Sequence, residues 1–90
     1  MFYIVSYDMQ DDKRRTRVAK TLLDFGNRVQ YSVFECIMDD TLLQKMTERL
    51  TEIVSDGDSV RIYALCAKCE ASVKIIGTGE ITKDEDVYII

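Results

Sequence analysis

The side chains able to do chemistry in this 90-residue chain are carboxylates and thiols, because it contains no histidine. Serine–histidine and cysteine–histidine pairs and histidine-ligated zinc are therefore excluded. Asp8 is the strongest candidate, since it directly follows the apolar run at residues 2–7 and Asp11 or Asp12 would cap the next helix better. One carboxylate binds Mg²⁺ poorly, but two copies across a dimer axis would hold one ion and activate water for phosphodiester hydrolysis.

A cluster of cations follows Asp8. Residues 13–20 read KRRTRVAK, with five basic side chains and no acid, although the whole chain has a net charge of −4. Residues 1–38 carry six basic and five acidic side chains, whereas residues 39–90 carry six and eleven. A local basic stripe can bind phosphates on an acidic protein; a solvated helix surface is the ordinary alternative. Arg15 falls where it would lean towards Asp8, whereas Arg17 is expected to be more exposed.

The cysteines and the first residues of the chain indicate where in the cell the protein is expected. Cys36, Cys66 and Cys69 are an odd number, and the start MFYIVSYD resembles neither a signal peptide nor a membrane span. We therefore expect reduced thiols, a cytoplasmic location and no membrane association. A structural zinc site normally needs four ligands: the Cys66–Cys69 CxxC motif supplies two, Cys36 would be a third, and four would require the motif of a second copy, so ordinary thiols are the favoured interpretation.

The elements that would position Asp8 follow from hydrophobic periodicity and turn residues. We expect a divided β segment with a kink near Gln30–Ser32, a second helix opening at Asp39 and a Thr41–Gln44 capping box. The predicted elements are a strand over 2–7, a helix over 12–25, two strands within 28–38, a helix opening at 39–41 and a strand over 59–66. This order predicts a ferredoxin-like α+β fold, βαββαβ, with an antiparallel sheet.

A second subunit is expected from what this fold leaves uncovered. Two helices would cover one sheet face, and apolar residues would remain on the other, so stacked sheets in a homodimer are favoured. We expect one domain over residues 1–90, with its core in 1–67 and a dimer-pairing tail in 73–90. Lys74–Gly77 and Asp86–Ile90 are β-like within this tail, and the C-terminal strand is expected to exchange between subunits.

The chain resembles the small CRISPR-associated endonuclease family, the partner of the CRISPR integrase in spacer acquisition. The resemblance covers essentially the whole chain, and its most specific run is RVQYSVFE at residues 28–35. It also includes the Tyr7-Asp8 pair, Gly26, the later DSVRIYALCAKC segment and the DVYII end. The family positions that match on the helix following Asp8 are Asp12, Arg15 and Arg17.

The resemblance implies a homodimeric, Mg²⁺- or Mn²⁺-dependent nuclease that cuts single-stranded RNA or double-stranded DNA in antiviral defence. Asp8 from both subunits would be the catalytic metal ligand. The matching positions that would shape the site or hold phosphates are Tyr7, Arg15, Arg17, Arg28 and Phe34. Taken on their own, Tyr7 and Phe34 also suit ordinary strand or core positions, and Arg28 suits an edge-strand charge.

Two other functions stay open. The family also acts as a non-catalytic dimeric scaffold that bridges integrase dimers and binds the DNA to be inserted. A toxin-type messenger ribonuclease is a more remote alternative, because related folds serve that use.

Overall fold

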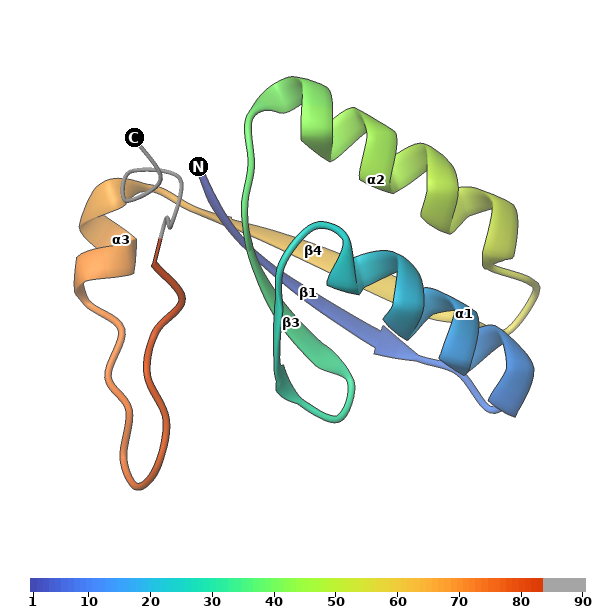
Figure 1. Cartoon of the computed structure of the whole chain (residues 1–90), viewed down its shortest axis with the longest axis horizontal. Helices are drawn as coiled ribbons and strands as arrows, with labels where there is room; N and C mark the ends of the chain where they lie inside the picture. The colour runs from blue at the N-terminus through green and yellow to red at the C-terminus, as the bar shows by residue number, and fades with distance from the viewer. Residues whose placement is uncertain (84–90) are drawn as a thin grey trace.

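The chain adopts the expected ferredoxin-like α+β arrangement in a computed structural model that describes residues 1–83. The elements in chain order are β1 (Phe2–Asp8), α1 (Asp12–Leu23), β2 (Asn27–Gln30), β3 (Val33–Ile37), α2 (Asp40–Ile53), β4 (Ser59–Leu65) and a short α3 (Ala67–Ala71). The strands form one antiparallel sheet in the order β2-β3-β1-β4, and α1 and α2 lie beside each other (Figure 1). The predicted order of strands and helices is confirmed.

The helix starts are fixed by aspartates. The Asp11 carboxylate accepts a hydrogen bond from the backbone N–H of Arg14 at 2.9 Å, as expected for the cap of α1. At α2 the predicted capping box is wrong. The Asp39 carboxylate accepts from the N–H of Leu42 at 2.8 Å, so Thr41 lies inside a helix that begins at Asp40.

Gly26 joins α1 to β2 in a tightly packed place. A Cβ atom on Gly26 would lie 2.9 Å from the Cα of Cys36 and still nearer to its sulfur. The glycine is therefore needed for the close approach of this connection to β3, and its backbone does not adopt a positive φ.

The core lies between the helices and one face of the sheet. Tyr3, Val5 and Tyr7 of β1 point into it together with Phe34 and Cys36 of β3. The helices contribute buried side chains to the same cluster, namely Val18, Ala19 and Leu22 of α1 and Met46, Leu50 and Ile53 of α2. Strand alternation therefore assigns the remaining β1 side chains to the opposite face.

We call that opposite face the open face; it carries Phe2, Ile4, Ser6 and Asp8 of β1 and their cross-strand neighbours, and Phe2 is buried. Residues paired across an antiparallel sheet point to the same side. The register thus adds Val33 and Glu35 of β3 and Ser59, Arg61 and Tyr63 of β4. Most of these side chains are half-buried or exposed, because neither α1 nor α2 packs on this face.

The segment after β4 departs from the prediction. Cys66 is the N-cap residue of the short helix α3. Lys74–Gly77 forms no strand and pairs with no edge of the sheet, and the chain bends at Gly77 and Thr78. Further on, the N–H of Thr82 donates to Glu35 Oε1 at 3.0 Å. The expected strand at Asp86–Ile90 lies outside the described residues. No helix within residues 1–83 has the length and apolar character needed to cross a membrane.

Candidate functional site

Asp8 lies at the end of β1, where its exposed side chain points to the open face. Its Cα partner in the sheet is Ser59, the first residue of β4. The shared phase of Asp8 with Ile4 and Ser6 is as expected from the sequence. None of the ion pairs formed among residues 1–83 involves Asp8, so its oxygens remain accessible to a ligand.

Arg61 shares the open face with Asp8. It pairs with Ser6 in the β1–β4 ladder, one pleat away from Asp8. The Tyr63 side chain and, more weakly, the Asp8 carboxylate raise the pKa of Arg61. The sequence did not single out Arg61. It shows only that Arg61 lies in a predicted strand and points to the same side as Tyr63.

An ion pair holds the beginning of β4 beside Asp8. Arg14 donates from Nε to Asp58 Oδ2 at 2.7 Å and from Nη2 to Asp58 Oδ1 at 3.2 Å. The Ser55 N–H also donates to Asp58 at 3.0 Å, and the Asp58 side chain is only 3% exposed. These hydrogen bonds, that of Arg14 first, lower the pKa of Asp58. The first turn of α1 is therefore fixed to the loop that leads into Ser59.

Three of the residues expected from the family resemblance lie close together on the helix side of the sheet, namely Tyr7, Arg28 and Phe34. Tyr7 Oη donates to the carbonyl of Tyr31 at 3.1 Å, and Arg28 Nε donates to the same carbonyl at 3.0 Å. The Arg28 guanidinium lies 5.7 Å from the ring centre of Phe34, and the Tyr7 and Phe34 rings pack 6.4 Å apart. This group supports the turn between β2 and β3, on the opposite side of the sheet from the Asp8 carboxylate.

Arg15 and Arg17 take different positions on α1. Arg15 reaches the end of β1, where it donates to the carbonyl of Met9 at 2.9 Å and pairs with Asp12. It therefore contacts the backbone next to Asp8 and not the carboxylate. Arg17 lines a surface groove between α1 and α2 together with Arg49, away from Asp8.

A metal ion needs more donors than one copy of residues 1–83 offers. Those residues contain no group of three or more histidine, cysteine, aspartate or glutamate side chains able to hold one. Cys36 is buried, which raises its pKa to about 11, whereas Cys66 and Cys69 are exposed near α3. A three-cysteine zinc site is therefore not formed. The exposed Asp8 carboxylate suits Mg²⁺ as a hard oxygen donor, provided that a second carboxylate joins it.

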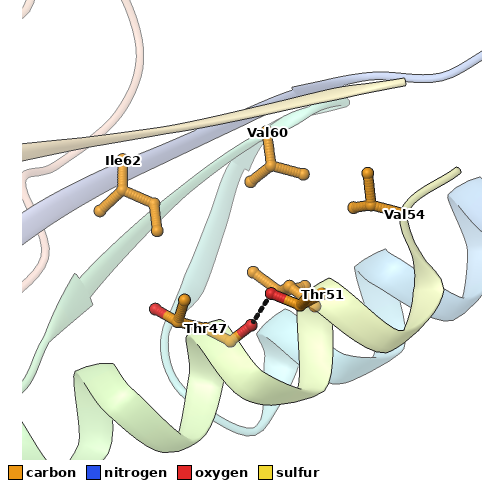
Figure 2. A pocket seen from close by; sticks show the side chains of 6 residues that line it. Thr47, Thr51, Val54, Val60 and Ile62 are labelled. Carbon is orange, nitrogen blue, oxygen red and sulfur yellow. Dashed lines mark hydrogen bonds between the residues drawn. The ribbon is translucent and has the colours of Figure 1, made fainter. Parts of the chain in front are cut away.

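A groove of about 360 Å³ lies between α2 and β4, and it is lined by apolar and threonine side chains where the surroundings of Asp8 are charged. Figure 2 shows its lining side chains, among them Thr47, Thr51, Val54, Val60 and Ile62. The hydroxyl of Thr51 is already occupied, since it donates to the carbonyl of Thr47 at 2.7 Å. Without a titratable side chain in its lining, the groove is no candidate for phosphodiester chemistry.

The fold and the site define a class of small ferredoxin-like proteins with an exposed carboxylate at the end of the first strand, on an open sheet face. Residues 1–73 match the family model described as CRISPR associated protein Cas2, and the chain belongs to this family.

Relatives and solved structures agree with this assignment. The chain is 42% identical over its whole length to "CRISPR-associated endoribonuclease Cas2 1" of Chloroflexus aurantiacus, which is also fully covered. It is similar to the crystal structure of Streptococcus pyogenes Cas2, with a TM-score of 0.75, 36% identity and coverage of 86% of this chain and all of the other. A chain of a "Partial Cas6-RT-Cas1--Cas2 complex" matches with a TM-score of 0.66, 26% identity and coverage of 83% and 89%.

Proposed function

We propose that this protein is a metal-dependent endonuclease of CRISPR spacer acquisition, active as a homodimer in which both copies of Asp8 form the centre. The observation that carries the proposal is the position of Asp8, exposed at the end of a central strand on the open face. The name of the Chloroflexus relative, an endoribonuclease, supports nuclease chemistry. The cytoplasm is the proposed location, since the three free thiols would stay reduced there.

The homodimer is proposed because the open face retains apolar side chains that water solvates poorly. Ile4 is half-buried in the centre of this face and Tyr63 is 48% exposed beside it. Packing the open face against a second copy would bury these side chains and double the number of carboxylates. Exchange of residues 86–90 between the copies stays a prediction.

The proposed roles of the residues follow from their chemistry. Asp8 and the partner's Asp8 would hold Mg²⁺ or Mn²⁺ through their carboxylate oxygens. A bound ion supplies a more acidic water and neutralises charge on the phosphodiester. Arg61, on the same face, would hold a phosphate oxygen through its guanidinium.

The test is cleavage by the Asp8→Asn variant, which keeps the side-chain shape and removes the charge. Wild-type protein is incubated with labelled single-stranded RNA and duplex DNA, with Mg²⁺ or with EDTA. We expect Mg²⁺-dependent cleavage by wild type and none by Asp8→Asn. Glu52→Gln is the matched control, because it makes the same change on the exposed surface of α2 and should cut normally.

Equal Mg²⁺-dependent cleavage by wild type and Asp8→Asn would refute the role of Asp8. Which of the two substrates is cut decides between RNA and DNA. The relative's name favours RNA.

A scaffold is the second candidate function. It is favoured by the similarity to a chain of the solved partial Cas6-RT-Cas1–Cas2 complex. In this function the dimer would bridge integrase dimers and bind the DNA to be inserted. A pull-down with the neighbouring integrase tests it: Asp8→Asn should bind the integrase as wild type does. Integrase binding by a protein that cuts neither substrate would favour the scaffold over the nuclease.

A further inference from the structure

The turn between β2 and β3 holds one aromatic side chain outwards. Tyr31 is 69% exposed, yet its backbone is firmly placed. Its carbonyl accepts hydrogen bonds from Tyr7 Oη at 3.1 Å and from two nitrogens of Arg28 at 3.0 and 2.5 Å. A large aromatic ring on a fixed turn loses little conformational freedom on binding.

Two arginine side chains lie near this ring. The guanidinium carbon of Arg28 lies 5.2 Å from the ring centre, and that of Arg15 lies 6.0 Å from it. Both arginines are held by backbone carbonyls, Arg15 by Met9 and Arg28 by Tyr31 itself. Most of the residue nevertheless remains accessible to solvent, so the arginines do not enclose the ring.

The ring opens onto a groove of about 570 Å³ between α1 and β2. Arg15, Lys20, Arg28 and Tyr31 line the groove, and Asp12 is its only acidic lining residue. Because Asp12 pairs with Arg15, the positive charges of Lys20 and Arg28 are left for a ligand. A fixed aromatic ring beside a positively charged groove is the combination that binds single-stranded nucleic acid.

We propose that Tyr31 stacks on a base of a single-stranded nucleic acid whose phosphates lie along Lys20 and Arg28. A single strand is favoured over a duplex, because base faces are available for stacking only where the strands are unpaired. The inference rests on the proposed function for its ligand class. It does not depend on cleavage, because the Tyr31 ring lies beside Arg15 of α1, on the helix side of the sheet, and Asp8 lies on the open face.

The test is equilibrium binding in EDTA, where the proposed nuclease is inactive. A fluorescein-labelled RNA of about a dozen nucleotides is titrated by anisotropy, alone and annealed to its complement. We expect Tyr31→Ala to weaken binding of the single strand roughly ten-fold and Tyr31→Phe to keep it, with a much smaller change for the duplex. Leu42→Ala is the control, as it removes an exposed side chain from α2.

Stacking also has an optical signature. A 2-aminopurine base in the single strand should lose fluorescence on binding wild type or Tyr31→Phe, and keep it with Tyr31→Ala. Thermal unfolding of each variant by circular dichroism verifies that the exposed substitution leaves the fold intact.

Unchanged single-strand affinity in Tyr31→Ala, or an equal loss for strand and duplex, would overturn the proposal. Loss of integrase binding with intact RNA binding would also overturn it and assign Tyr31 to a protein interface. If wild type cuts nothing while the Tyr31 pattern is seen, the nuclease proposal fails and the stacking site stands. If wild type cuts nucleic acid but Tyr31→Ala binds the single strand as wild type does, the nuclease proposal stands and the stacking site fails.

Discussion

Two side chains of opposite charge, Asp8 and Arg61, lie on the same sheet face and divide the proposed chemistry between them. The carboxylate is a hard ligand for a cation, whereas the guanidinium is suited to a phosphate oxygen. Their closeness depends on the β1–β4 register, which pairs Ser6 with Arg61 and Asp8 with Ser59. In the proposed reaction, Arg61 would stabilise negative charge that develops on the phosphodiester.

We predict that Arg61→Gln lowers the cleavage rate on the order of 100-fold, because a fixed donor to a developing charge is lost. Single-turnover cleavage of labelled RNA in Mg²⁺ measures the effect. Lys45→Gln removes a cation from α2 and should leave the rate unchanged. A wild-type rate for Arg61→Gln would exclude this arginine from the reaction.

At the scale of the elements, the Arg14–Asp58 pair connects the beginning of α1 with the loop before β4. Both oxygens of Asp58 accept from Arg14, and the loop N–H of Ser55 adds a third hydrogen bond. Since Ser59 follows directly and pairs with Asp8, the ion pair also connects α1 with the part of β4 that lies beside Asp8.

We predict that Asp58→Asn lowers the free energy of unfolding at neutral pH and that the difference from wild type disappears in acid. The pKa of Asp58 is lowered in the folded protein, so its ionised form stabilises the fold above the unfolded pKa of about 3.9. This contribution is lost as the pH falls through the lower, folded pKa. Urea unfolding at several pH values measures it, with Asp56→Asn as the control. A difference that does not depend on pH would contradict the assignment.

The order of the elements was predictable because each has a local signal. The apolar run of β1, the Asp11 cap of α1 and the turn between β2 and β3 are all encoded by neighbouring residues. The helix cap at Asp39 was missed because two adjacent aspartates and a threonine compete for the same position, and only packing selects one.

The site was less predictable than the fold because it depends on long-range pairing. The phase of Asp8 with Ile4 and Ser6 follows from strand alternation. The approach of Arg61 requires the register of a strand far along the chain. Tyr31 falls within the β-like run at residues 28–38, and its 69% exposure depends on a turn that Tyr7 of the distant strand β1 and Arg28 of the neighbouring strand β2 support through the Tyr31 carbonyl.

For the molecule as a whole, the open face is the surface from which the quaternary structure is inferred. We predict that Tyr63→Glu converts a dimer into a monomer, because the introduced charges would meet across the interface and lose solvation. Sedimentation equilibrium over a range of concentrations measures the mass.

Leu42→Glu provides the matched control, since it adds the same charge on α2 at a similarly exposed position. It should remain dimeric. A dimer of undiminished affinity in Tyr63→Glu would mean that the open face is not the interface.

The single Asp8 carboxylate that each copy would contribute to the metal also relates the proposed activity to the concentration of protein. A monomer carries half a centre, so activity would follow the dimer population set by mass action and fall on dilution. In the proposed dimer, a chain that lacks the Asp8 carboxylate but still associates would withdraw an intact chain from the active pool. Such a variant, produced together with the wild type, would act as a dominant inhibitor in proportion to its share of the dimers.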